Sequence, residues 1–382
     1  MRIAFYAPMK PPGHPQPSGD RRMANLLMQA LGLAGLEVEL ASRFSSRDGV
    51  GDPERQARLA QVGAGMADRI LRRFRARPAA ERPGCWFTYH LYYKAPDWLG
   101  PAVSRGLDIP YLVAEASVAP KRAGGPWDLG HRATLAAVER ASAVITLNPD
   151  DAGCLPETCP VRLIPPFLDP APGRAAAGAR DRHRATLCQG FALNPGRPVI
   201  AAVAMMRQGD KLASYRLLAE ALARLPDPAW QLLIVGDGPA RGDVEQAFYS
   251  LVEKAGGGRR VHFAGAVDEP ELPAMLAGCD LLAWPAINEA YGMALLEAQA
   301  AGLPVVAGRS GGVPALVESG ETGLLSEPGN AAAFAANLAH LLSDPERRER
   351  MGRAALAKVA REHSLEQAAV SLKRILETLG VA

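Results

Sequence analysis

The sequence predicts an α/β protein with two doubly wound parallel-sheet domains. Short apolar runs alternate with segments of helical periodicity in both halves of the chain, and this βα rhythm is typical of parallel sheets. A chain of 382 residues also exceeds what one compact core usually holds. We expect a first domain over 1–170, a connection over 171–198, a second domain over 199–364, and a last helix over 365–382 for which packing back on the first domain is considered.

Composition argues against several functional classes. The 43 basic and 40 acidic residues leave a formal net charge of +3, so bulk charge does not suggest a nucleic-acid partner. No apolar run reaches the ~20 residues of a membrane span, and the N-terminal MRIAFYAP enters a strand without the longer apolar segment of a signal peptide. Five irregularly spaced cysteines favour reduced thiols, and no zinc site is expected. We therefore expect a cytoplasmic protein.

The first half begins with a buried strand over 2–7, a Pro- and Gly-rich loop over 8–20, a helix over 21–35 and a strand over 36–42. Further strands are expected at 85–90, 110–116, 143–148 and 161–166. The composition then shifts, and 168–198 shows little apolar periodicity apart from a short helical segment near 180–189. This shift is why we interpret the region as the connection between domains.

The second half repeats the rhythm. Strands are expected at 199–204, 230–238, 261–267, 280–285 and 304–308, with a short helix, a turn and a short strand within 312–326. Helices are expected at 211–225, 243–256, 270–279, 292–302, 330–344, 347–363 and 365–380. Ligands of open parallel sheets bind beyond the carboxyl ends of the strands, so the expected site is a central cleft that the two sheets face.

The stretch WPAINEAYGMALLEAQAAGLPVVA carries two glutamates in an almost uncharged run. Glu289 stands in the turn after a strand, Gly292 at the start of a helix, and Glu297 inside that helix. The first amides of a helix lack partners and favour an anion, and glycine allows its close approach. The carboxylates would lie on the order of 10 Å apart, the reach of a sugar, a diphosphate and a ribose in series. A solvated Glu297 is the alternative, because two glutamates at this spacing are common.

Positive charge follows the first strand of the second half. Arg207 and Lys211 lie in the turn at its carboxyl end, where two cations would stabilise a leaving diphosphate without a divalent metal. A solvated turn is the alternative. Gly236, in the glycine turn of LLIVGDGP, would let a nucleotide approach the backbone. The glycine turn SGGVPALV either lines the cleft or is a plain tight turn.

Taken together, these motifs resemble those of retaining glycosyltransferases of the GT-B fold, specifically glycosyltransferase family 4 (glycosyl transferases group 1). The segments that carry the resemblance are MMRQGDK, LLIVGDGP, VHFAGAVDEPEL and NEAYGMALLEAQAAGLPVVAGRSGGVPALVESGETGLL, in that order between about Val199 and Leu325. The resemblance implies transfer of a sugar from a nucleotide-sugar to an acceptor hydroxyl with retained anomeric configuration, in cell-envelope or polysaccharide glycan synthesis. It implies no metal and no other cofactor.

The resemblance also implies roles for individual residues. Arg207 and Lys211 would bind the diphosphate, Glu289 would face the donor sugar, and Glu297 would hold the ribose. The backbone near Val267 would meet the base. The amides that would hold sugar and phosphate are those of Tyr291, Gly292, Met293 and Ala294.

The first half resembles the family only weakly. PSGDRRMANLLMQAL is similar to the family's glycine-containing loop, which would place Ser18, Gly19 and Asp20 near the donor. Many members carry a histidine at the end of a middle strand, whereas this sequence offers Glu115 there and His90 at the end of an earlier strand. For these two residues, purely structural roles are equally open interpretations.

A basic helical segment over 56–78 admits three interpretations. Leu59, Val62, Met66, Ile70 and Phe74 share one stripe, and eight arginines lie between Arg55 and Arg82. We favour an ordinary helix packed on the first sheet. Peripheral contact with the inner face of a membrane, where a glycan or lipid-linked glycan acceptor would lie, is the second interpretation. A patch that binds an anionic acceptor is the third.

Other functions remain open beside sugar transfer. A nucleotide-sugar epimerase or a phosphorylase could use the same scaffold, since fold does not fix function, although no motif for a phosphorylase's cofactor-bearing lysine is evident. A non-catalytic nucleotide-sugar-binding protein is a third class. A dehydrogenase is disfavoured, because the first βα turn is long, proline-rich and lacks G-x-G-x-x-G.

Overall fold

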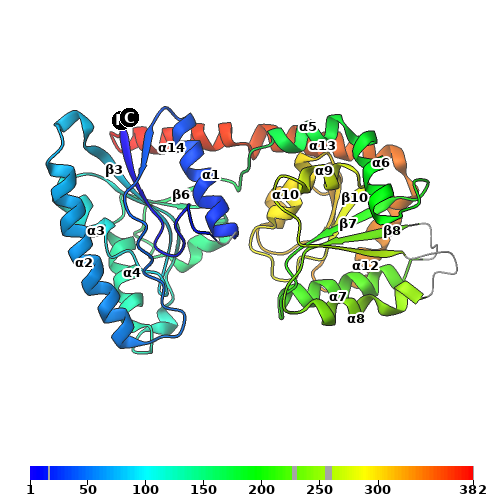
Figure 1. Cartoon of the computed structure of the whole chain (residues 1–382), viewed down its shortest axis with the longest axis horizontal. Coiled ribbons are helices and arrows are strands. Elements are labelled where there is room, and N and C mark those ends of the chain that lie inside the picture. The colour runs from blue at the N-terminus through cyan, green and yellow to red at the C-terminus, as the bar shows by residue number, and fades with distance from the viewer. Residues whose placement is uncertain (16–17, 226–229, 254–259, 382) are drawn as a thin grey trace. The chain divides into compact units, whose positions relative to one another are not determined.

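A computed structural model of the chain describes residues 1–15, 18–225, 230–253 and 260–381. The chain forms two compact units (Figure 1): unit 1 is Met1–Pro165 with Leu365–Ala382, and unit 2 is Pro166–Ser364. The last helix, red in Figure 1, therefore belongs to the same unit as the blue N-terminal segment. Within the described residues, no helix is both long and apolar enough to cross a membrane.

Unit 1 contains a six-stranded parallel sheet in the order β2-β1-β3-β4-β5-β6. Its strands are β1 (Arg2–Tyr6), β2 (Glu37–Leu40), β3 (Pro83–Tyr92), β4 (Tyr111–Ser117), β5 (Ala143–Thr146) and β6 (Val161–Leu163). Apolar side chains fill β3, β4 and β5, which are largely buried because helices cover the sheet on both faces.

Five α-helices and three short 3-10 turns are described in unit 1. The helices are α1 (Gly19–Leu33), α2 (Pro53–Arg75), α3 (Gly100–Leu107), α4 (Asp128–Arg140) and α14 (Leu365–Thr378). The turns are η1 (Ala79–Glu81), η2 (Pro120–Arg122) and η3 (Pro149–Cys154). Helices α2, α3 and α4 lie on one side of the sheet and α1 on the other, with α14 packed against α1 (Figure 1).

The basic helix α2 uses a narrower apolar face than its sequence predicts. Ile70 and Phe74 are buried, as are the small Gly63 and Ala67, but Val62 is 50% exposed. Gly63 fits here because a Cβ would lie 2.3 Å from Cβ of Trp98. The helix thus packs on its own unit through small residues, while most of its arginines face solvent.

Unit 2 contains a second six-stranded parallel sheet, in the order β12-β11-β10-β7-β8-β9. Its strands are β7 (Val199–Val203), β8 (Gln231–Val235), β9 (Val261–Gly265), β10 (Leu281–Trp284), β11 (Val305–Gly308) and β12 (Gly323–Ser326). These strands carry the largest buried apolar cluster described in the chain. The α/β fold with two doubly wound parallel sheets is therefore confirmed.

Nine α-helices are described in unit 2: α5 (Ala171–Gly178), α6 (Arg180–Phe191), α7 (Asp210–Ala223), α8 (Arg241–Glu253), α9 (Leu272–Ala277), α10 (Met293–Ala300), α11 (Val313–Leu316), α12 (Ala331–Ser343) and α13 (Pro345–Glu362). Figure 1 shows α7, α8 and α12 on one face of the sheet and α5, α9, α10 and α13 on the other. The end of the helix expected over 243–256 lies outside the described residues.

The structure differs from the connection expected over 171–198. Most of this stretch forms α5 and α6, which pack against α9 within unit 2. Polar contacts attach α6, because Arg180 and Arg184 both donate to the carboxylate of Asp280 at 2.8 Å. Because polar contacts hold α6 in place, its sequence lacks a continuous apolar stripe, and Leu187 is the one buried residue of this helix.

Candidate functional site

Each sheet has one point where the direction of chain progression reverses. In unit 2 the chain moves from β7 through β8 to β9 on one side, and from β10 through β11 to β12 on the other. In unit 1 the reversal lies between β1 and β3. Ligands of doubly wound sheets bind beyond the carboxyl ends of the strands at such points. Ligands are therefore expected at the loops after β7 and β10 in unit 2, and at those after β1 and β3 in unit 1.

In unit 2 an ion pair forms at this point. Lys211 in the first turn of α7 donates to Oε2 of Glu289, which lies in the loop after β10, with Nζ 2.5 Å from that oxygen. The two side chains are 22% and 14% exposed, so both remain accessible from one side. The structure thus joins two predicted site residues that stand 78 positions apart.

The indole of Trp284 contacts both members of this ion pair. Its Nε1–H donates to the same Oε2 of Glu289 at 3.0 Å, and the Lys211 ammonium lies 5.3 Å from the ring centroid. Trp284 is 2% exposed and makes an edge contact with Tyr215 at 5.0 Å. Sequence reasoning did not give Trp284 a role. The only available signal was its position as the last residue of a strand.

The loop that carries Glu289 is conformationally strained. Ala286 and Asn288 have φ of 56° and 50°, a region that residues with a side chain seldom adopt. Two contacts from α7 hold it in place: Ser214 Oγ accepts from the backbone N–H of Ile287 at 3.0 Å, and Asn288 donates to Asp210 at 3.1 Å. The start of α7 therefore both supplies Lys211 and shapes the loop opposite.

Helix α10 begins directly after this loop, as predicted. Gly292 caps it with φ 74°, a conformation that glycine adopts without strain, and no side chain caps the helix. Within the described part of the chain, the N–H groups of Met293 and Ala294 have no hydrogen-bond acceptor. These amides can bind an anion because they point along the positive end of the helix dipole.

The other predicted site residues of unit 2 lie in segments that follow strands β7, β9 and β10. Arg207 lies in the turn after β7, is exposed, and forms no ion pair or hydrogen bond through its guanidinium with any described residue. Tyr291 precedes Gly292 and is half-buried, as is Glu297 in the second turn of α10. Val267 follows β9, an edge strand two positions from β7 in the sheet.

The glycine turns after β8 and β11 make close contact with the chain's own backbone. A Cβ on Gly236, whose φ is 139°, would lie 1.9 Å from the carbonyl oxygen of Ala204. A Cβ on Gly311, with φ 47°, would lie 2.2 Å from the carbonyl oxygen of Glu289. Gly312 donates its N–H to the carbonyl of Ala290 at 3.0 Å. Backbone packing therefore explains both glycines, and the second turn supports the loop that carries Glu289.

In unit 1 the structure joins Asp20 and His90. Asp20 lies in the first turn of α1 after β1, His90 lies near the end of β3, and Oδ1 of Asp20 is 2.9 Å from Nδ1 of His90. Burial alone would raise the pKa of the Asp20 carboxyl, but the hydrogen bond and charge of His90 lower that pKa below its usual value. Ser18 caps α1 by accepting from Arg21 N–H, and Gly19 is the first helical residue.

Two of the predicted residues of unit 1 have a strained backbone. His90 in β3 and Glu115 in β4 have φ of 62° and 60°, and the flanking pairs Tyr89–Ala114 and Leu91–Ala116 put them side by side. Oε1 of Glu115 accepts from the backbone N–H of Leu147 at 2.7 Å. The side chain of Glu115 therefore contacts the backbone that follows β5, whereas the side chain of His90 contacts α1.

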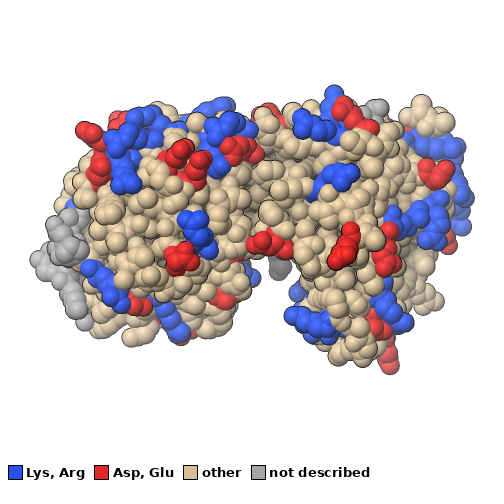
Figure 2. Space-filling model, turned by 180° about the vertical axis from the view of Figure 1, so that it is seen from behind, with Lys and Arg blue, Asp and Glu red and all other residues tan. Residues whose placement is uncertain are grey.

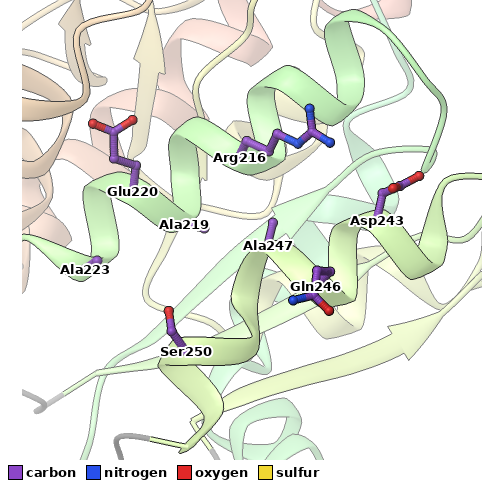
Figure 3. A pocket seen from close by; sticks show the side chains of 8 residues that line it. All are labelled: Arg216, Ala219, Glu220, Ala223, Asp243, Gln246, Ala247 and Ser250. Carbon is purple, nitrogen blue, oxygen red and sulfur yellow. The ribbon is translucent and has the colours of Figure 1, made fainter.

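Two hollows in the surface lie away from these residues. One, of about 360 Å³, lies between α7 and α8 and is lined by small and charged side chains that include Arg216, Glu220 and Asp243 (Figure 3). The other, of about 570 Å³, lies between α3 and α4. Buried Asp97 at its wall accepts from Thr88, Tyr111 and two backbone amides, and burial raises the pKa of its carboxyl. This network therefore serves the structure of unit 1.

Comparison with known proteins agrees with the second unit's motifs. Residues 193–358 match the family model described as glycosyl transferases group 1. A D-inositol 3-phosphate glycosyltransferase of Corynebacterium efficiens is 39% identical over 139 residues, which are 36% of this chain and 33% of that protein. A protein of the same description from Corynebacterium jeikeium is 32% identical over 230 residues, covering 58% of this chain and 52% of its own length. The chain thus spans about a third to half of these curated relatives.

Solved structures show the fold over the whole chain. Sucrose-phosphate synthase from Thermosynechococcus elongatus matches with a TM-score of 0.69 and 22% identity over 99% of each chain. HepE from Anabaena, solved in complex with UDP, matches with a TM-score of 0.70 and 17% identity over 99% of this chain and 100% of its own. The fold is that of the GT-B class.

Proposed function

Because its second unit belongs to the glycosyl transferases group 1 family, we propose that the protein transfers a sugar from a nucleotide-diphosphate-sugar to an acceptor hydroxyl. The observation that carries this proposal is the Lys211–Glu289 pair beside the uncapped start of α10. A cation, a carboxylate and two unpaired amides meet at the reversal point of the sheet, where a polar ligand with both phosphate and hydroxyl groups would find complementary partners.

A nucleotide-sugar donor is also consistent with one structural neighbour. HepE from Anabaena has been solved with UDP and with UDP-glucose. In the proposed reaction the bond between the sugar's anomeric carbon and the diphosphate oxygen breaks, and a bond from that carbon to the acceptor oxygen forms. The acceptor proton leaves with the nucleoside diphosphate or is lost to water. We propose, as the resemblance implies, that the anomeric configuration is retained.

Charge stabilisation on the leaving diphosphate is the proposed task of Lys211, Arg207 and the amides of α10. An ammonium has three donors, so Lys211 can keep one on Glu289 and offer others to phosphate oxygens. Arg207 has no acidic partner in the described residues and is able to bind phosphate oxygens bidentately. Preplaced cations supply the electrostatic stabilisation that a divalent metal provides elsewhere, so we propose a metal-independent, cofactor-free reaction.

The sugar and nucleoside ends are assigned by position. Glu289, fixed by Trp284, would accept hydrogen bonds from donor-sugar hydroxyls, and Glu297 from the ribose. Gly236 and Val267, which follow β8 and β9, would lie toward the base. In unit 1, Asp20 and His90 would serve the acceptor side, with the carboxylate of Asp20 orienting the imidazole.

Cell-envelope or polysaccharide glycan synthesis as the setting is a proposal from the resemblance alone. Peripheral membrane contact would involve α2, near whose C-terminal end Arg72, Arg73 and Arg75 lie. Figure 2 shows basic side chains, with acidic ones among them, along the edge of unit 1 that α2 forms. Because Ile70 and Phe74 of α2 are buried in unit 1, such contact would be mainly electrostatic, and co-sedimentation with anionic vesicles at low and high salt would test it.

The function is tested by thermal shift and product analysis with a panel of nucleotides and nucleotide-sugars. A nucleoside diphosphate or nucleotide-sugar should raise the melting temperature. Glu289→Ala should lose transfer by about a hundredfold or more while remaining folded, because Lys211 loses its partner and the sugar loses an acceptor. The matched control is Glu220→Ala, an exposed glutamate on α7, which should change neither property.

Three results would contradict the proposal. Full activity of Glu289→Ala would remove the assignment of the site. Interconversion of the nucleotide-sugar in the absence of any acceptor would favour an epimerase. Donor binding without transfer to any acceptor and without hydrolysis would favour a non-catalytic binding protein.

A further inference from the structure

We propose that unit 1 carries a binding site for a phosphate-bearing sugar, formed by Lys94 and Arg122 on the rings of Tyr93 and Trp127. These four residues are called the aromatic–cation cluster. The inference rests on the proposed function in one respect, namely that the bound sugar phosphate is the acceptor. The sugar phosphate is either a free molecule or the headgroup of a lipid.

The geometry of the cluster is unusual in that two cations share the same two rings. Lys94 Nζ lies 5.8 Å from the Tyr93 centroid and 5.1 Å from that of Trp127. Arg122 Cζ lies 5.0 and 5.2 Å from the same centroids. The rings themselves contact edge to face at 5.8 Å. Cation–π attraction therefore holds two like charges against the same pair of rings.

These charges lack acidic partners. Among the described residues, no carboxylate forms an ion pair with Lys94 or Arg122. Arg122 Nε is buried and has no hydrogen-bond acceptor. Burial raises the pKa of Tyr92, the neighbour of Tyr93, and the nearby charge of a third cation, Arg47, partly opposes that rise. Two cations that form no ion pair favour an anion, and a phosphate with about two negative charges would offset their mutual repulsion.

Buried polar residues hold the cluster in place. Gln56 donates to Asp48 at 2.9 Å and to the carbonyl of Pro126 at 2.8 Å, next to Trp127. Both Gln56 and Asp48 are buried. Gly51 is needed where this loop meets Trp127, because a Cβ there would lie 3.1 Å from the indole. The rings are thus rigidly positioned, as a binding surface requires.

The cluster continues the row of residues that begins at the Asp20–His90 pair. The His90 ring lies 5.2 Å from Tyr92, and Tyr92 lies 5.4 Å from Tyr93. Lys94 follows β3, and Arg122 and Trp127 follow β4, the neighbouring strand, so all lie toward the carboxyl edge of the sheet. A ligand held by the cluster would therefore extend toward His90, where the proposed reaction places the acceptor.

The combination of rings and cations favours a sugar phosphate over a neutral glycan. The exposed parts of aromatic rings pack against the apolar face of a sugar ring, whereas two cations contribute little to binding hydroxyls alone. A phosphate is the common anion of sugars that matches guanidinium and ammonium donors together.

Direct binding to the full-length protein tests the inference. The probes are a panel of hexose phosphates with the matching unphosphorylated hexoses, and phosphatidylcholine vesicles with or without phosphatidylinositol. We expect phosphorylated probes to bind at least about tenfold more tightly than neutral ones, and Lys94→Gln with Arg122→Gln to remove this preference. Arg105→Gln, at an exposed arginine on α3 of the same unit, is the matched control and should keep it. Preference for the vesicles alone would identify a lipid-linked source.

Several outcomes would overturn the inference. One is equal binding, or no binding, of phosphorylated and neutral probes in both the soluble and the vesicle arm. Others are unchanged phosphate preference in the double variant, or an equal loss of that preference in Arg105→Gln. Nucleotide-induced thermal shifts of the same variants separate the two proposals. If no nucleotide binds the parent protein, the donor assignment fails, while the sugar-phosphate measurement still decides the cluster's role.

Discussion

The indole N–H of Trp284 is one of two donors that fix the position of the Glu289 carboxylate. Oε2 of Glu289 accepts from Trp284 at 3.0 Å and from Lys211, so the side chain is held at a fixed position beside the start of α10. A carboxylate held by two donors needs little reorganisation when substrate binds, which is the basis of electrostatic preorganisation. Trp284 thus acts on the site through Glu289.

Trp284→Phe should lower kcat more than it raises KM for the donor. Phenylalanine keeps a buried ring under Lys211 but removes the hydrogen bond, a contribution of about 1.5–3 kcal/mol for a charged acceptor. We expect kcat to fall by roughly tenfold. Steady-state kinetics would measure this, with Trp86→Phe as control. Trp86 is also buried and donates to a side chain, Thr88, but lies in unit 1. Equal kinetic losses in both variants would point to general destabilisation.

At the scale of elements, the site depends on turns that approach each other closely. The loop after β10 is supported by the glycine turn after β11, where Gly311 leaves no room for a Cβ beside the carbonyl of Glu289. The strained φ values of Ala286 and Asn288 lie within the supported loop. The energy of this strain is therefore offset by packing from a neighbouring strand's turn.

Gly311→Ala should displace the loop that carries Glu289 and weaken donor binding by at least about tenfold. The control is Gly329→Ala, which also has positive φ but open space around its Cβ position. Gly329→Ala should cost about 1 kcal/mol of stability through backbone strain alone and leave donor binding unchanged. Melting temperatures and donor titrations of both variants would be compared. A similar donor affinity in the two variants would show that the contact with Glu289 is unimportant.

Whether a helix or strand could be predicted from the sequence depends on the kind of contact that holds it in the fold. The strands and most helices of unit 2 were predictable because continuous apolar runs such as β7 and β8 fill its core. Helix α6 was assigned to a connection because it is attached by Arg180 and Arg184 to Asp280, a contact between residues about 100 positions apart. No local periodicity reports such a bond.

For the candidate site, the positions of the residues at the strand ends could be predicted, but their side-chain partners could not. Lys211 and Glu289 were expected at one edge because both follow apolar strands, but their ion pair depends on β7 and β10 being neighbours, which only the strand order shows. Trp127 and Arg122 join Tyr93 and Lys94 for the corresponding reason in β3 and β4. Residue types and strand ends indicate the edge of the sheet, whereas side-chain partners require the tertiary structure.

At the scale of the whole molecule, both units use the same design. In each sheet the direction of chain progression reverses once, and each reversal brings together a pair of side chains from two segments distant in sequence: Lys211 with Glu289, and Asp20 with His90. The chain enters unit 2 at Pro166 and leaves it at Ser364. These two passages lie side by side, because Leu168 forms an isolated bridge with Ser364 and donates to the carbonyl of His363 at 3.0 Å.

His363 makes this junction sensitive to pH. Its Nδ1–H donates to the carbonyl of Pro166 at 2.8 Å, and the side chain is 1% exposed. Burial is the main reason why the pKa of His363 is lowered from its ordinary value of 6.5. In the unfolded chain the imidazole therefore takes up a proton at higher pH than in the folded chain. Its contribution to stability is present above about pH 6.5 and is lost as the pH falls toward the lower folded-state pKa.

The melting temperature should consequently fall between about pH 7.5 and pH 5.5, and His363→Gln should reduce that fall. Glutamine keeps an N–H donor for the Pro166 carbonyl but does not take up a proton in this range. His340→Gln, at an exposed histidine on α12, is the matched control and should leave the pH dependence as it is in the parent protein. Thermal scans of the three proteins across this range would measure the effect. An equal fall in all three would show that His363 does not set the acid stability of the junction.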